Sequence, residues 1–292
     1  MFLAREPVLT VFIFALAPSM ICADDALTTA QRQHEQALAR WKRVMGEVPP
    51  IQAESAHFIV LSSSPHTAMQ VKNLAATLER ALTLARKPLR YEPQDEVWPG
   101  KAGVYLLDEP EQLHTFMLAV AKKRPDPDSL GVASLRRDFP FVAGCGGTEK
   151  YDPNAADQVV EQLAAAMLTS KVGRDAPDWV VSGFGRATVW HASPAAISTR
   201  SQRALARKLL AAGRSADDVW SGKLSAFEAG PLQASLVDFL AYGLGPQKFT
   251  ALAEAFRPER PRQQKTAAEA FRAAGLDPTG INRVWHAWAR RH

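Results

Sequence analysis

Apolar positions along the chain follow two spacings, and the change from one to the other divides the molecule. In the first half, short runs of apolar and β-branched residues alternate with longer stretches whose apolar residues recur once per helical turn. The short runs predict strands, and the longer stretches predict amphipathic helices. The strands are expected at residues 57–61, 102–107, 130–134 and 139–144. After residue 192 only the helical spacing is found, which predicts an α+β fold with a small mixed sheet, followed by an all-helical part.

Two consecutive helices are predicted in the middle of the chain, over residues 154–190. The first carries the apolar pair Val159-Val160 in an alanine-rich sequence, and the second opens at Pro177-Asp178-Trp179. Proline is favoured in the first turn of a helix, where a backbone N–H would have no intrahelical partner. The gap between the two helices suits a turn that brings the second back against the first.

These helices resemble those of the gluzincin metallopeptidases, in particular the peptidase-MA-like branch of envelope proteins. In that family the first helix carries His-Glu-x-x-His after two apolar residues. A second helix, opened by Pro-x-Trp, supplies a Glu just before a Gly. The apolar pair at 159–160, the Pro-x-Trp start at 177–179 and Gly183 stand at the matching places here.

The resemblance covers most of the chain from residue 57 onward. A segment of the type His-Phe-x-Val opens the sheet in that family, as residues 57–60 do here, and a closing Trp-x-x-Trp recurs at residues 285–288. It implies a zincin-like α+β domain over residues 51–192 and a helical C-terminal region over residues 193–292. Residues 24–50 are expected to form a helix on the outside of the domain.

The residues that would perform zinc chemistry are replaced. A catalytic zinc ion needs three protein ligands and an open position for water, and a Glu beside the first His acts as the general base. Glu161, Gln162 and Ala165 stand where the first His, the Glu and the second His belong. Ser182 stands where the third ligand belongs. We therefore expect no metal, no other cofactor, no catalytic residue and no peptidase activity, and we call these four positions the vestigial cleft.

Polar groups at a metal site that has lost its metal need other partners. A buried polar group without a partner costs ~1–3 kcal/mol. Glu161 is therefore expected to have a cationic partner or contact with solvent. Gln162, which cannot act as a base near neutral pH, is expected to form a hydrogen bond within the cleft.

A peptide-binding edge is also implied by the resemblance. In gluzincins, the strand just before the metal helix forms the edge along which the extended substrate lies. Phe141, Val142, Ala143 and Gly144 occupy that place, so they could add a peptide as an extra strand through backbone hydrogen bonds alone. The alternative is an edge strand that is covered by a loop of the chain itself.

Residues 1–23 are predicted to be a secretory signal peptide. The apolar run over residues 8–17 is too short to span a bilayer, and Ala23 offers a cleavage site after it. A lipoprotein signal at Cys22 is disfavoured because Ile21 is not small, and an uncleaved N-terminal anchor is the alternative. We expect an exported protein, periplasmic or secreted, without a transmembrane span after cleavage.

Composition and charge narrow the partners only slightly. The 292 residues are 47% apolar and 22% charged, with a formal net charge of +5, which is ordinary for a globular protein. The positive charge favours anionic surroundings such as cell-wall polymer or a membrane surface, or is simply a solvated basic surface. The basic cluster at residues 122–124 is expected at a helix end, where it complements the helix dipole, so nucleic acid is not expected as a partner.

Cysteine use agrees with the absence of a cysteine-based metal site. After signal cleavage Cys145 is the only cysteine, which excludes an internal disulfide and a cysteine metal site. We expect this residue to be buried as a small apolar side chain, with a reactive thiol as the alternative.

Three functions are compatible with these features. The first is an exported, catalytically inactive peptidase-like protein that binds a peptide or an envelope protein, which best explains a scaffold kept without its chemistry. The second is an enzyme with rebuilt, non-zinc chemistry. Its candidate residues are Glu161, Ser182, His191 and Asp175, although a serine nucleophile needs a base within hydrogen-bond reach and no histidine lies one helical turn from Ser182. The third is a purely structural envelope protein. No feature of the sequence determines the oligomeric state.

Overall fold

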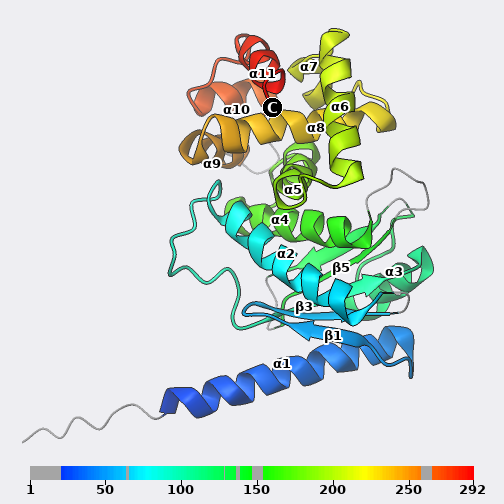
Figure 1. Ribbon diagram of the computed structural model, residues 1–292. Helices are drawn as coiled ribbons and strands as arrows, with labels where there is room; N and C mark the ends of the chain where they lie inside the picture. Colours follow the sequence, from blue (N-terminus) through cyan, green and yellow to red (C-terminus); the bar gives the residue numbers. More distant parts are fainter. Residues whose placement is uncertain (1–20, 64–65, 128, 136–138, 147–153, 258–264) are drawn as a thin grey trace, which may run out of the picture.

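The computed structural model describes residues 21–63, 66–127, 129–135, 139–146, 154–257 and 265–292, and of residues 21–28 only the backbone (Figure 1). In this part of the chain a five-stranded mixed sheet lies between helical layers, and further helices pack beyond one of them. The predicted α+β class is confirmed at this level. The strands are β1 (Ile51–Glu54), β2 (Phe58–Ser62), β3 (Ala102–Leu107), β4 (Gly131–Ser134) and β5 (Phe141–Cys145).

The helices lie close to the places where apolar residues recur at helical spacing. Up to the centre of the chain they are α1 (Ile21–Met45), α2 (Ala68–Arg86), α3 (Pro110–Phe116) with the π-helical turn η1 (Met117–Ala121), α4 (Ala155–Val172) and α5 (Asp178–Ala192). Beyond it lie α6 (Ile197–Ala211), α7 (Ala216–Trp220), α8 (Ala226–Asp238) with η2 (Phe239–Gly243), α9 (Pro246–Ala255), α10 (Ala267–Ala273) and α11 (Ile281–Ala289). Most of the predicted signal peptide lies outside the described residues.

The sheet has the order β1-β2-β3-β5-β4. The central strands β2, β3 and β5 are parallel, whereas β1 and β4 are antiparallel strands at the two edges. β1 was not expected from the sequence, because its four residues, Ile-Gln-Ala-Glu, are too short and too polar to produce a strand signal. The other four strands lie within two residues of their predicted bounds.

Side chains of the central strands alternate between two separate parts of the core. Phe58 and Val60 of β2 belong to the core cluster that also contains residues of α2, α4 and α5, whereas Ile59 and Leu61 belong to the cluster on the other side of the sheet. These strands are buried on both faces, as expected of parallel strands that are covered by helices. On the second face α1 lies across the sheet and buries Trp41, so this helix forms a layer of the fold (Figure 1).

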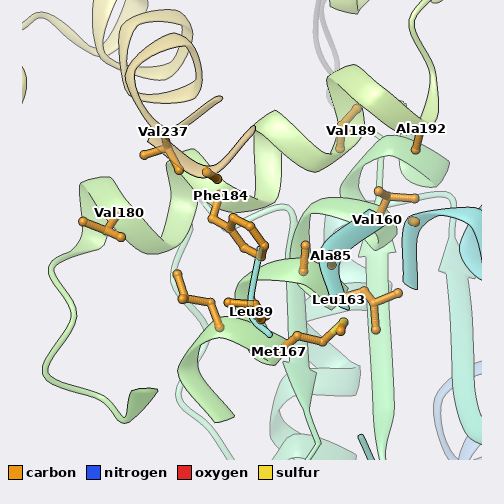
Figure 2. Packing of buried hydrophobic residues seen from close by; sticks show 14 of the residues in the cluster. Ala85, Leu89, Val160, Leu163, Met167, Val180, Phe184, Val189, Ala192 and Val237 are labelled. Carbon is orange, nitrogen blue, oxygen red and sulfur yellow. The ribbon is translucent and has the colours of Figure 1, made fainter. Parts of the chain in front are cut away.

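The larger part of the core is continuous from the sheet into the C-terminal helices. Figure 2 shows Phe184 of α5 in the middle of this packing, with Val237 of α8 above it and Leu89 and Met167 below it. All four side chains are buried. Because α5 contacts α4 on one side and α8 on the other, the helical region is anchored directly to the α+β part.

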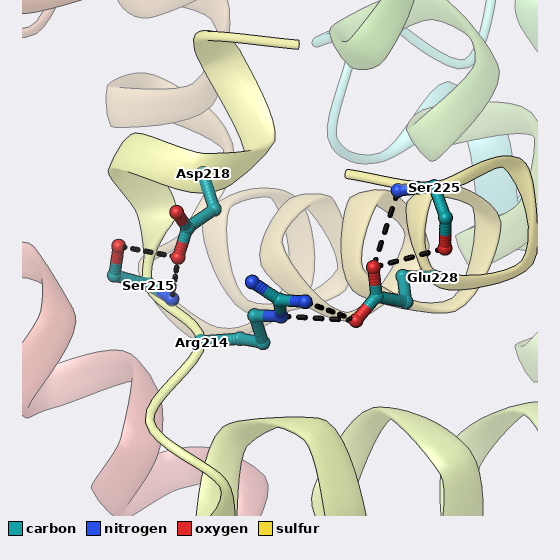
Figure 3. Close-up of polar contacts among 5 residues, drawn as sticks. All are labelled: Arg214, Ser215, Asp218, Ser225 and Glu228. Carbon is teal, nitrogen blue, oxygen red and sulfur yellow. Dashed lines mark hydrogen bonds and ion pairs between the residues drawn. The ribbon is translucent and has the colours of Figure 1, made fainter. Parts of the chain in front are cut away.

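Polar contacts order the turns between the C-terminal helices. Arg214 donates two hydrogen bonds to Glu228 Oε1 of α8, at 2.9 and 2.6 Å (Figure 3). The same glutamate accepts from Ser225 at the start of α8, and Asp218 accepts in the same way from Ser215 at the start of α7. Such capping boxes satisfy N–H groups that have no partner inside the helix, so α7 and α8 have defined starts.

Candidate functional site

A groove of about 700 Å³ runs along the edge strand β4. Residues Gly131 to Ser134 form one wall, and α4 with the first turns of α5 form the other. From α4 the groove is lined by Gln162, Ala165 and Thr169, and from α5 by Asp178 and Val181. Two of the four positions of the vestigial cleft, Gln162 and Ala165, therefore face one groove together with β4, which is an edge strand among the described residues.

The outer side of β4 carries backbone groups that do not take part in the pairing with β5. The N–H of Cys145 donates to the carbonyl of Leu130, which makes these two residues a hydrogen-bonded pair of the ladder. Such pairs alternate with non-hydrogen-bonded pairs, so Gly131 and Ala133 point their N–H and C=O groups away from β5. The Gly131 carbonyl accepts from Ser129 Oγ at 2.8 Å. Within the described residues, the outward N–H and C=O of Ala133 have no strand beside them.

This arrangement corrects the predicted position of the edge. Phe141, Val142, Ala143 and Gly144 belong to β5, which pairs with β3 on one side and with β4 on the other. All four residues are buried, so they cannot accept an added strand. The edge beside α4 is β4, the strand that comes before β5 in the chain.

Helix α4 lies close against the sheet because glycines face it. It begins at Asn154, whose Oδ1 accepts from the N–H of Asp157 at 2.8 Å. A methyl group on Gly131 would lie 2.5 Å from Cγ of Gln162, so the stem of Gln162 packs on the bare backbone of β4. The hydrogen bond that was expected for the Gln162 amide is not found among the described residues, and the half-buried amide lies at the groove, where water can reach it.

Glu161 points away from the groove and is paired with a cation. Its Oε1 accepts from Nε of Arg186 at 3.2 Å, and the two side chains are 9% and 30% exposed. Arg186 lies on α5, one turn after Ser182, and was not singled out in the sequence. The expected cationic partner of Glu161 is thus confirmed. Burial raises the pKa of Glu161, and the charge and hydrogen bond of Arg186 act in the opposite direction.

A second buried carboxylate lies one turn before Glu161. Asp157 is 5% exposed and accepts a hydrogen bond from Ser198 Oγ at 3.0 Å. Burial raises its pKa, and Ser198 partly offsets this effect. Both acids line a small cavity together with the hydroxyl of Thr199, which has no hydrogen-bond partner among the described residues. Removal from water therefore dominates the electrostatics on this side of α4.

Close approach of three helices fixes the position of Ser182. A methyl group on Gly183 would lie 2.7 Å from the carbonyl oxygen of Gln233 on α8, and one on Gly185 would lie 2.6 Å from the carbonyl oxygen of Glu161. α5 is therefore held tightly between α4 and α8. Ser182 itself is half-buried, and its hydroxyl has no hydrogen-bond partner among the described residues.

Comparison with known protein families, with curated proteins and with solved structures finds no match to this chain. Its function has to be inferred from the geometry of the groove and of the residues around it.

The remaining candidates for rebuilt chemistry are not assembled into one site. Nε2 of His191 lies 2.6 Å from Oδ1 of Asp238, a buried acid of α8, and the imidazole packs against the ring of Tyr242. Asp175 lies in the exposed turn between α4 and α5. Cys145 is fully buried, and burial raises the pKa of its thiol, which agrees with the predicted apolar role. Within the described residues, no hydrogen bond or ion pair joins any of them to Ser182.

Two properties of the described residues bear on the predicted partners. No three His, Cys, Asp or Glu side chains in this part of the chain gather closely enough to hold a metal ion. Among the helices that the structure describes, none is both long and apolar enough to cross a membrane.

Proposed function

We propose that the chain is an exported, catalytically inactive peptidase-like protein whose β4 groove binds an extended peptide. The observation that carries this proposal is the outward-facing backbone of Ala133, which lies beside a groove of about 700 Å³. A peptide that adds to a sheet edge gains affinity from main-chain hydrogen bonds and specificity from pockets for alternate side chains. The outward N–H and C=O of Ala133 can supply main-chain hydrogen bonds, and the groove has room for side chains of the peptide.

The electrostatics of α4 favour binding over chemistry. In the zincin-like arrangement that we propose for residues 51–192, Glu161 replaces the first metal ligand. Its charge is compensated by Arg186 on α5 instead of by a metal ion. Gln162 and Ala165 present an amide and a methyl group to the groove, and neither can take a proton from water near neutral pH.

Ala133→Pro is the test of the peptide-binding edge. Proline lacks the outward N–H but is tolerated at an edge position whose N–H does not serve the ladder. We expect the variant to fold like the parent and to bind its peptide about tenfold more weakly or worse, because one main-chain hydrogen bond and the approach of the added strand are lost. The probe is a fluorescent peptide selected on the parent protein from a random-peptide phage library.

Ala133→Val is the matched control, because it enlarges the side chain and keeps the N–H. It should bind the selected peptide within a few-fold of the parent. Equal binding by the proline and valine variants would show that the edge is not used. If the library yields no binding peptide at all, the proposal fails and a purely structural envelope role is favoured.

The vestigial cleft gives a second test. The protein as it stands should hold no stoichiometric zinc after reconstitution, as measured by elemental analysis. Combining Glu161→His, Gln162→Glu, Ala165→His and Ser182→Glu restores the ligand set of the family, and it should create measurable zinc affinity if the side chains at positions 161, 165 and 182 can turn to one metal ion. One tightly bound zinc ion in the parent would overturn the proposed loss of the metal site. No zinc in a folded fourfold variant would mean that α4 and α5 do not hold the peptidase-like geometry, and the resemblance would be withdrawn.

Export is tested on the secreted product. Cleavage after Ala23 predicts a mature chain that begins at about Asp24, and intact mass spectrometry of protein from an envelope fraction measures this directly. Recovery of the chain with Met1, or with a lipid on Cys22, would contradict the predicted signal peptide.

A further inference from the structure

A second cavity, of about 670 Å³, lies on the other side of the turn between α4 and α5. Its walls come from this turn, from α7, from the end of α9 and from the start of α10. The volume falls within the range of about 300–1,000 Å³ that is usual for pockets that bind small molecules or single side chains of a partner. We call it the aromatic pocket.

Three aromatic rings form one side of the aromatic pocket. The ring of Trp179 lies 6.4 Å from that of Trp220 and 6.1 Å from that of Phe256, measured between centroids. Trp179 and Phe256 are almost fully buried, whereas Trp220 is partly exposed. The ring of Phe271 on α10 packs against that of Trp220, with 5.2 Å between the two centroids. This contact helps to fix the position of the Trp220 ring. Of the three rings, Trp220 therefore has the most surface that a bound apolar or aromatic group could cover.

The aromatic pocket and the β4 groove lie on the two sides of one turn. Arg174, Ala176 and Asp178 line both cavities, so the turn that joins α4 to α5 forms the boundary between them. Ala176 is the small residue at this boundary and is 8% exposed. A chain that leaves the groove along α5 would therefore reach the aromatic pocket without crossing another element.

Among the described residues that line the aromatic pocket, positive and negative side chains are equal in number. Arg174 and Lys265 are positive, and Asp175 and Asp178 are negative. A pocket with equal numbers of each sign has no net preference for a charged group, and its aromatic wall favours a neutral one. These features describe a side-chain subsite rather than an anion or cation site.

We propose that the aromatic pocket receives a large apolar or aromatic side chain of the peptide that lies in the β4 groove. This inference rests on the proposed peptide binding and adds its specificity: the preferred peptides carry such a residue on the segment that passes the α4–α5 turn. The main-chain contacts with β4 provide general affinity, and the aromatic pocket selects among sequences.

Ala268→Phe tests the pocket because it fills it from the wall formed by α10. Ala268 is half-buried and lines the cavity, and phenylalanine can be accommodated in a helix. Ala273→Phe is the matched control, since Ala273 is exposed on the same helix. Both variants are first compared with the parent by circular dichroism and thermal unfolding.

Two probes separate this proposal from peptide binding in the groove. The first is N-acetyl-tryptophanamide, followed by ligand-observed NMR, which needs no contact with β4. We expect saturation transfer with the parent and with Ala273→Phe, and its loss with Ala268→Phe. The second is the library-selected peptide, whose affinity for Ala268→Phe should fall about tenfold while its affinity for Ala273→Phe stays unchanged.

The outcomes are distinct. If Ala133→Pro abolishes peptide binding while Ala268→Phe changes neither probe, the groove binds peptides and the subsite proposal is wrong. If the tryptophan derivative binds but no peptide does, the aromatic pocket binds aromatic groups, and the proposed peptide-binding function is wrong. If an N-acetylglucosamine oligomer shows saturation transfer and the tryptophan derivative does not, the proposal is wrong and sugar stacking on Trp220 is favoured.

Discussion

Gly185→Ala is expected to lower the free energy of unfolding by about 2–3 kcal/mol, the range of an overpacked core. The added methyl group would lie 2.6 Å from the carbonyl oxygen of Glu161 and 2.8 Å from its Cγ. The oxygen belongs to the backbone of α4 and cannot turn aside, so α4 and α5 must separate. Alanine is favoured over glycine in a helix by ~1 kcal/mol, and this gain acts against the predicted loss.

Chemical denaturation of the parent and the variant measures the effect, and Gly146→Ala is the control. Among the described residues, the nearest neighbour of a methyl group on Gly146 would be the backbone nitrogen of Ala155 at 3.5 Å, which is an ordinary contact. This control should change stability by no more than about 0.5 kcal/mol. A Gly185→Ala protein as stable as the parent would mean that α4 and α5 are not in close contact at this point.

Local patterns predicted the elements that depend on neighbouring residues. β3 has its predicted bounds because an unbroken apolar run between polar segments is a strand signal in itself. α4 and α5 follow from Asn154, Pro177 and the apolar pairs between them. The helical character of the C-terminal region was also recognised from its spacing, although the first two turns of α8 were not.

The order of the strands could not be predicted in the same way. β4 and β5 are close in the chain and form an antiparallel pair, and either one could lie beside β3. Only the completed sheet determines that β5 takes the inner position, where its residues are buried on both faces. The peptide edge was therefore assigned to the wrong strand of this pair.

Ion pairs between side chains of different helices could not be predicted from the sequence for a related reason. The sequence indicated that Glu161 needs a cation, but it gave no reason to choose Arg186 among 35 lysines and arginines. The pairing depends on the crossing of α4 and α5, which the glycines of α5 allow. Asp238, the partner of His191, lies 47 positions away and was missed because α8 reaches it only in the folded chain.

Arg186→Ala should destabilise the protein by about 3 kcal/mol at neutral pH, because it leaves a buried carboxylate without its partner. The side chain of Glu161 is 9% exposed, so water cannot fully replace the guanidinium. Glu161→Gln in the same chain removes the unpaired charge and should recover most of the loss. The double variant is therefore the control that distinguishes charge burial from lost packing of Arg186.

The loss of stability caused by Arg186→Ala should depend on pH in a defined direction. Burial already raises the pKa of Glu161 while Arg186 lowers it, so removing Arg186 raises this pKa further. The folded variant then binds a proton more tightly than the unfolded chain, and its stability falls as pH rises from the unfolded pKa of Glu161 to its raised folded pKa. Relative to the parent, Arg186→Ala should therefore lose most at neutral pH and least near pH ~4, where Glu161 is largely protonated.

Urea denaturation at several pH values measures this difference between the two proteins. Compared with the single variant Glu161→Gln, the double variant should show no such change with pH, because neither protein carries the Glu161 carboxyl group. An equal loss at acid and neutral pH would mean that Arg186 stabilises the protein through packing alone. In that case Glu161 would not carry a buried charge. The proposed function, in which a charged Glu161 paired with Arg186 replaces a metal ligand, would then lose this support.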